Sequence, residues 1–140
     1  MAYILKLWDG ALMCKNQKLD IERLVDDYNG LRIYMFNTNN QDQEYVLDTA
    51  NCTVCTYRSI EDLFRVTTKR MYLGTNEVEI NCNTFFEVVN SDLIEEVRTN
   101  GLIGQHPPQE YHHIVILAGN STFELVTFKA PELKSVESLN

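Results

Sequence analysis

Residues 113–128 read HIVILAGNSTFELVTF and carry the clearest structural signal in the chain. Their two arms, His113–Leu117 and Phe123–Phe128, are rich in β-branched and aromatic side chains, which favour strands. Gly119-Asn120-Ser121 between the arms is a turn sequence, so the stretch predicts an antiparallel hairpin. The fold therefore contains a β-sheet near its C-terminal end, and the neighbouring segments extend it.

Two more hairpins are expected upstream. Asp9-Gly10 is a frequent hairpin turn, and it separates Tyr3–Trp8 from Ala11–Lys15. Leu31–Asn37 is apolar on both faces, which is typical of a central, buried strand. We expect it to pair with a strand that begins at Tyr45–Leu47.

The clearest helix is expected at residues 20–30. The apolar side chains at helical spacing are Ile21, Leu24, Val25 and Tyr28. This i, i+3, i+4, i+7 pattern places them on one helix face. Asp20 can cap the start of the helix, and Gly30 suits its C-terminus.

Two shorter helices are expected further along the chain. One begins at Ser59, and the other is capped near Asn90 or Ser91. Their apolar sides consist of Ile60, Leu63 and Phe64 in the first and of Leu93, Ile94 and Val97 in the second. Residues 78–82 alternate between apolar and polar side chains, which predicts a half-buried strand that resumes at Thr84–Val89. For Val66–Leu73 the pattern leaves helix and strand open.

These elements predict an α+β fold, with an antiparallel or mixed sheet built of hairpins and two or three short helices packed on it. We expect a single domain over residues 1–130 and a short C-terminal tail, helical or frayed, over residues 131–140. A chain of 140 residues with 44% hydrophobic residues can bury one core. No signal-peptide pattern or apolar run of about 20 residues is present, so we expect a cytoplasmic protein of a bacterial or virus-infected host cell.

The charge of the chain is strongly acidic and unevenly distributed. The formal net charge is −8, and residues 71–97 carry six acidic and no basic side chains. The acids predicted to contact a partner are Glu77, Glu79, Glu87, Asp92, Glu95 and Glu96. Such a surface suits a basic protein partner and repels nucleic-acid phosphate, so no direct nucleic-acid or membrane contact is expected.

The cysteines and histidines offer only a weak site. Cys52 and Cys55 have the spacing of half a zinc site, but no second pair matches them, so we expect no metal or other cofactor. His112 and His113 point to opposite faces if they lie on a strand. At most one of them is expected to pair with a cysteine or with a carboxylate such as Glu110, and we expect a histidine at a sheet edge with access to solvent.

No nucleotide-binding glycine loop and no hydrolase G-x-S-x-G elbow is present. The sequence therefore favours a non-enzymatic, acidic protein-binding module. We expect an inhibitor of another protein, either immunity- or antitoxin-like or a phage or viral counter-defence protein. Two alternatives stay open: a small-molecule-binding protein or small enzyme with a Cys/His site, and a structural subunit of a larger assembly. Homo-oligomerisation is compatible with all three.

Overall fold

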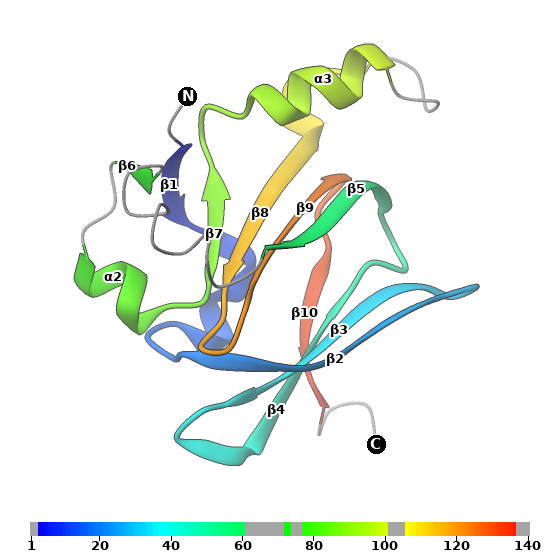
Figure 1. Ribbon diagram of the computed structural model, residues 1–140. Coiled ribbons are helices and arrows are strands. Elements are labelled where there is room, and N and C mark those ends of the chain that lie inside the picture. The colour runs from blue at the N-terminus through cyan, green and yellow to red at the C-terminus, as the bar shows by residue number, and fades with distance from the viewer. Residues whose placement is uncertain (1–2, 61–71, 74–76, 101–105, 137–140) are drawn as a thin grey trace.

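The computed structural model describes residues 3–60, 72–73, 77–100 and 106–136, and places them in two β-sheets with short helices (Figure 1). The strands of the larger sheet are β1 (Tyr3–Leu7), β5 (Thr53–Ile60), β6 (Tyr72–Leu73), β7 (Phe85–Val88), β8 (Tyr111–Leu117) and β9 (Thr122–Phe128). The strands of the smaller sheet are β2 (Leu19–Asp27), β3 (Gly30–Asn37), β4 (Asn40–Asp48) and β10 (Glu132–Ser135). The helices are the 3-10 turns η1 (Asp9–Cys14) and η2 (Pro108–Glu110) and the α-helices α2 (Glu77–Cys82) and α3 (Asp92–Asn100).

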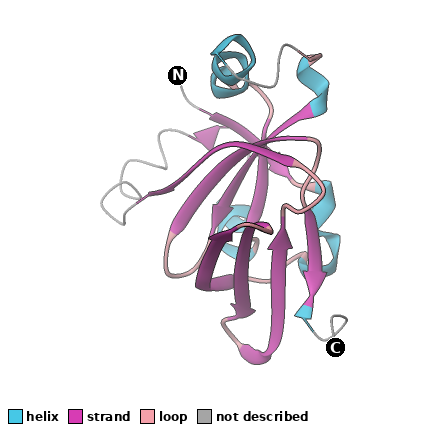
Figure 2. Cartoon of the chain, turned by 90° about the vertical axis from the view of Figure 1, so that its right-hand side faces the viewer, coloured by secondary structure: helices cyan, strands magenta, loops and turns pink. Residues whose placement is uncertain are grey.

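The larger sheet has the strand order β5-β9-β8-β7-β1-β6, and the smaller sheet has the order β10-β4-β3-β2. Neighbouring strands pair antiparallel, except that β1 and β6 are parallel. Strands dominate the described chain, and the helices are few and short (Figure 2). The predicted fold class, α+β with a sheet built of hairpins and short helices, is confirmed.

The main core lies between the two sheets. Its members from the smaller sheet include Leu19, Ile33 and Leu47, and those from the larger sheet include Ile114 and Leu125. A second cluster lies on the opposite face of the larger sheet, and its members are Leu5, Phe86, Val88, Val115 and Leu117, with Ile80 of α2 packed against them. The larger sheet is therefore apolar on both faces.

Strand β8 shows why the predicted hairpin is so apolar. Ile114 and Ile116 face the main core, whereas Val115 and Leu117 face the second cluster. A strand that is buried on both faces needs apolar side chains at successive positions. The predicted β8–β9 and β3–β4 hairpins are both confirmed, and so is the short helix after residue 90.

The prediction of a helix at residues 20–30 is wrong, because Leu19–Asp27 is strand β2 and pairs with β3. The turn between them consists of Tyr28 and Asn29, and the backbone N–H of Asn29 donates to Asp27 Oδ1 at 2.9 Å. Gly30 follows at φ +101°, a conformation that glycine adopts without a steric penalty. Asn29-Gly30 is therefore a hairpin turn sequence, and not the end of the helix that the sequence pattern predicted.

A β-bulge explains why β2 resembles a helix. The pairing register shifts between Ile21 and Arg23, so that one extra residue enters the strand. Ile21 is paired with Met35 and Leu24 with Ile33, which places both on the face toward the main core. The bulge therefore places two apolar side chains on one face of the sheet three residues apart, as a helix would, although Leu24 lies beyond the core and is 38% exposed.

The predicted hairpin at Asp9-Gly10 is also wrong. Residues 9–14 form η1, and β1 pairs instead with β7 and β6. Trp8, Ala11 and Cys14 are buried, and a spacing of three residues matches the three residues per turn of a 3-10 helix. The Trp8 ring packs on Phe85 with a centroid distance of 5.8 Å, which holds η1 against the larger sheet.

The predicted strand over residues 78–82 is a helix, α2. Lys18 stabilises the C-terminal end of this helix, because its Nζ donates to the carbonyl oxygens of Ile80, Asn83 and Leu117 at 2.9, 2.7 and 2.6 Å. Such a cation satisfies carbonyl groups that a helix end leaves unpaired. The predicted strand at Thr84–Val89 is confirmed as β7.

Two other boundaries differ from the prediction. Ser59 does not start a helix, because β5 continues through it and pairs Ser59 with Phe123. The remainder of that predicted helix, with Leu63 and Phe64, lies outside the described residues, as does most of Val66–Leu73. Glu132–Ser135 is not a helical or frayed tail, because it forms β10 and pairs with β4.

Strand β2 is the last strand of the smaller sheet, and a side chain covers part of its outer edge. Asn120 Oδ1 accepts a hydrogen bond from the backbone N–H of Ile21 at 2.9 Å, and Asn120 Nδ2 donates to the carbonyl of Ile21 at 2.8 Å. Gly119 N–H donates to the carbonyl of Leu19 at 2.8 Å. The β8–β9 turn thereby pairs with β2 in place of another strand.

Among the described helices, none combines the length and the apolar character that crossing a bilayer requires.

Replacing Gly30 with alanine tests the β2–β3 turn. We expect Gly30→Ala to lower the free energy of unfolding by about 1–3 kcal/mol, since a side chain strains the backbone at this φ. Urea unfolding measures the change, and Tyr28→Ala in the same turn is the control, with an expected change within about 0.5 kcal/mol. Equal stability of Gly30→Ala and the unmodified protein would contradict this assignment.

Candidate functional site

The six acids predicted to contact a partner do not gather on one surface. Glu77 and Glu79 belong to α2, and Asp92, Glu95 and Glu96 belong to α3. These helices lie at opposite ends of β7 (Figure 1). Glu87 lies on β7 between them. The acidic stretch of sequence is therefore divided into separate regions in space.

Glu87 is engaged within the protein. Its Oε2 lies 2.8 Å from Nδ1 of His112, and its Oε1 lies 3.6 Å from Nζ of Lys6. Burial raises the pKa of this carboxyl, but His112 and Lys6 outweigh it and hold the pKa below its ordinary value. Its side chain is 16% exposed, so Glu87 is a poor contact residue for a partner.

On α3, Asp92, Glu95 and Glu96 are exposed. Glu95 accepts two hydrogen bonds from Arg98 Nη1, both at 2.8 Å. Among the predicted contact acids whose side chains the structure describes, those of this helix are the most accessible.

The two histidines point to opposite faces of β8, as predicted. The expectation that at most one pairs with a carboxylate is wrong, since His112 contacts Glu87 and His113 contacts Glu124. Glu110, the suggested partner, pairs instead with Lys129 at 2.6 Å. His113 is fully buried, so the expectation of solvent access is also wrong for this residue.

His113 lies in a polar chain that is buried at its centre and runs from Ser91 through β8 and β9 to Arg58 on β5. Ser91, just before α3, lies with Oγ 2.7 Å from His113 Nδ1. His113 Nε2 lies 3.1 Å from Glu124 Oε2 on β9, and Arg58 Nε on β5 donates to Glu124 Oε1. Burial raises the pKa of the Glu124 carboxyl, but His113 and Arg58 hold it below its ordinary value. Glu124 is therefore ionised at neutral pH.

The protons in this polar chain follow from that charge. An ionised Glu124 only accepts hydrogen bonds, so His113 donates from Nε2. Nδ1, the other ring nitrogen, lies 2.7 Å from the hydroxyl oxygen of Ser91. The same Ser91 Oγ accepts from the backbone N–H of Ile94 at 3.0 Å, which confirms Ser91 as the cap of α3.

The cysteines show no metal geometry in the described part of the chain. No group of three or more His, Cys, Asp or Glu side chains there could hold a metal ion. Cys52 Sγ donates to the carbonyl of Thr49 at 3.5 Å. Burial is the largest effect on the thiols, and it raises the pKa of Cys14 to about 12 and that of Cys52 to about 11. Both therefore stay protonated at neutral pH.

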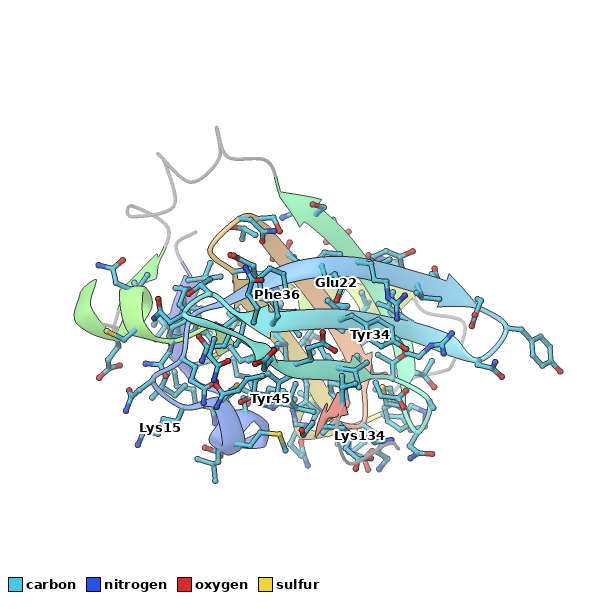
Figure 3. All side chains as sticks on the ribbon, turned by 90° about the horizontal axis from the view of Figure 1, so that it is seen from below. Lys15, Glu22, Tyr34, Phe36, Tyr45 and Lys134 are labelled. Carbon is cyan, nitrogen blue, oxygen red and sulfur yellow. The ribbon has the colours of Figure 1, made fainter. Side chains whose placement is uncertain are left out.

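The structure reveals a surface that the sequence did not indicate, at the far end of β2 and β3. This hairpin extends beyond β5 in Figures 1 and 3. Tyr28 in the turn is fully exposed, and Leu24 and Tyr57 are about two-fifths exposed. The Tyr57 hydroxyl donates to Asp26 Oδ2 at 2.5 Å, which links β5 to β2. We call Leu24, Asp26, Asp27, Tyr28 and Tyr57 the hairpin-tip surface.

Three members of the hairpin-tip surface, Leu24, Asp26 and Tyr57, are placed together by strand register and a hydrogen bond. Leu24 and Asp26 are two residues apart on the same face of β2, which corresponds to about 7 Å along the strand. The Tyr57 ring stacks on Phe123 at 5.7 Å, so it is held in place. The sequence signal for this surface was Asp26-Asp27-Tyr28 before Asn29-Gly30, which places an aromatic ring at a turn beside two carboxylates.

On the outer face of the smaller sheet, neighbouring side chains cover the aromatic rings more than they do on the hairpin-tip surface. Tyr34 and Phe36 lie in the middle of β3 on this face and are half-buried (Figure 3). The guanidinium of Arg23 lies over the Tyr34 ring at 4.2 Å from its centroid. By comparison, the hairpin-tip surface leaves more aromatic area accessible.

Comparison with known proteins gives no relative: no family model, curated protein or solved structure matches this chain.

The buried carboxylates make stability depend on pH. The pKa of Glu124 and that of Glu87 are lower in the folded state than the ordinary value of 4.5. Their contribution is therefore present above about pH 4.5 and is lost as the pH falls through the folded pKa. We expect urea unfolding midpoints to decline below pH 4.5.

The variant Glu124→Gln should be about 1–3 kcal/mol less stable at pH 7, since an amide replaces the charged acceptor of the hydrogen bonds from His113 and Arg58. It should also show a shallower decline in acid. Glu96→Gln, on the exposed face of α3, should reproduce the profile of the unmodified protein. Parallel profiles for Glu124→Gln and the unmodified protein would refute the role of Glu124.

Thiol reactivity tests the burial of the cysteines. With iodoacetamide at pH 8 we expect exposed Cys82 to be alkylated first and buried Cys14 last, because a protonated, buried thiol is a poor nucleophile. Peptide mass spectrometry over time measures the order. Alkylation of Cys14 as fast as Cys82 in the folded protein is the contrary result, and urea should remove the difference.

Proposed function

We propose that this protein is a protein-binding module that docks a basic partner on the hairpin-tip surface. The observation that carries the proposal is the exposure of Tyr28, Leu24 and Tyr57 toward the same end of the β2–β3 hairpin, where the Tyr57 hydroxyl donates to the Asp26 carboxylate. Exposed aromatic side chains that converge with charge are typical of the residues that dominate binding energy. A net charge of −8 favours a basic partner further.

The hairpin-tip surface is suited to a stable complex because part of it is already ordered. Tyr57 is fixed by its stacking on Phe123 and by its hydrogen bond to Asp26, so it loses little side-chain entropy on binding. Asp27 is held by Arg32, whose Nη2 donates to Asp27 Oδ2 at 2.6 Å. The basic partner would therefore meet exposed aromatic and aliphatic side chains and the carboxylate of Asp26.

In biological terms we propose an inhibitor of the partner, of the immunity, antitoxin or counter-defence kind, acting in the cytoplasm of a bacterial or virus-infected cell. A protein of this class requires a rigid surface and no catalytic motif. The acids of α3 form a competing contact surface, because Asp92, Glu95 and Glu96 are also exposed.

The test compares two matched surface variants. Proteins captured from an extract of the native cells are quantified with the unmodified protein, with Leu24→Ser/Tyr28→Ala, and with Glu95→Lys/Glu96→Lys. A partner that binds the hairpin-tip surface is depleted with the first variant, whose affinity should fall at least about tenfold. It should be retained with the second.

The purified partner then gives association rates. Asp26→Lys should slow association, most strongly at low salt, because it removes electrostatic attraction. If charge reversal at Glu95 and Glu96 slows association more than Asp26→Lys, the contact surface is α3. If neither variant nor salt changes the rate, the proposal of a basic partner fails.

A further inference from the structure

The polar chain of Ser91, His113 and Glu124 has a geometry that goes beyond helix capping. A hydroxyl lies 2.7 Å from one imidazole nitrogen, and a carboxylate lies 3.1 Å from the other. We propose that Ser91 is a nucleophile that takes an acyl group from a small activated ester or thioester, with His113 as its base. Glu124 is the positioning residue that fixes the tautomer of the imidazole.

The direction of the hydrogen bonds suits this role. In the neutral form of His113, donation from Nε2–H to Glu124 leaves Nδ1 as the basic nitrogen, and Nδ1 faces the Ser91 hydroxyl. A base within hydrogen-bond distance of the hydroxyl and oriented by a third group is the arrangement that activates a serine. The neighbouring Arg58 keeps Glu124 ionised, so that Glu124 can also stabilise an imidazolium.

The position of Ser91 in the fold supports nucleophilic attack. Ser91 follows β7 and precedes the nine-residue helix α3, so the first-turn N–H groups of α3 lie at its side. The N-terminus of a helix favours negative charge, such as the charge that develops on the carbonyl oxygen of a substrate. The backbone N–H of Ile94 occupies one lone pair of Oγ, which leaves the second for attack.

Ser91 is more exposed than His113 and Glu124, as expected for a nucleophile and the residues that support it. Ser91 is partly exposed, whereas His113 and Glu124 are 0% and 1% exposed. The three residues are therefore open to solvent only on the side of Ser91, from which both a substrate and the hydrolytic water would approach.

The step balances without a further reactant. Oγ of Ser91 bonds to the carbonyl carbon, and its proton moves to Nδ1 of His113. The bond from that carbon to the leaving oxygen or sulfur breaks, and the proton on His113 passes to the leaving group. Water then attacks the acyl-serine with His113 again as the base, releases the carboxylic acid and restores the hydroxyl.

A fluorophosphonate probe tests the nucleophile, since the P–F bond breaks as an Oγ–P bond forms and fluoride leaves. We expect intact-mass and peptide mass spectrometry to find the probe on Ser91. Ser91→Asn should abolish labelling although asparagine still caps a helix, and Ser121→Ala should have no effect. Glu124→Gln should slow labelling at least about tenfold, and His113→Asn at least about a hundredfold.

The substrate class is tested with p-nitrophenyl acetate, from which a burst of nitrophenolate equal to the protein concentration is expected. Circular dichroism identifies any variant that fails to fold. The comparison of unmodified protein, Ser91→Asn and Ser121→Ala decides the proposal without the buried variants. Labelling of the folded protein that does not exceed that of Ser91→Asn overturns it, as does labelling that Glu124→Gln leaves unchanged in a folded variant.

Discussion

The burial of β8 on both faces is the constraint on which the rest of the structure depends. Its residues from His113 to Leu117 are all buried, so each face of the larger sheet must be covered. The smaller sheet covers one face and encloses the main core, and α2 packs against the cluster on the other. The pairing of β5 with β9 and the long-range pairing of β1 with β7 extend this sheet on the two sides of β8.

The sequence predicted those parts of the fold that are local. The β8–β9 and β3–β4 hairpins and the cap of α3 at Ser91 are recorded in neighbouring residues, and they are confirmed. The register shift in β2 could not be seen, because a bulge gives a strand the spacing of a helix. The contacts of Lys18 with α2 join residues more than sixty positions apart, so no local pattern contained them.

The candidate sites were less predictable than the fold. His113 and Glu124 lie in an apolar strand pair, and their role can be inferred only when their hydrogen-bond partners are known. These partners, Ser91 and Arg58, come from distant segments of the chain. Burying such groups is costly unless every one finds a hydrogen bond. The acidic residues are close together in the sequence, but they are separated in space because α2 precedes β7 and α3 follows it. The hairpin-tip surface depends on β5 meeting β2, which is a tertiary contact.

Asn120 has a consequence for the behaviour of the protein in solution. An uncovered edge strand can pair with the edge of another molecule and so lead to aggregation. The amide of Asn120 occupies both backbone groups of Ile21, and the bulge that follows bends β2 away from a straight template. One side chain from the turn of another hairpin thus terminates the smaller sheet, which protects this acidic protein against self-association along β2.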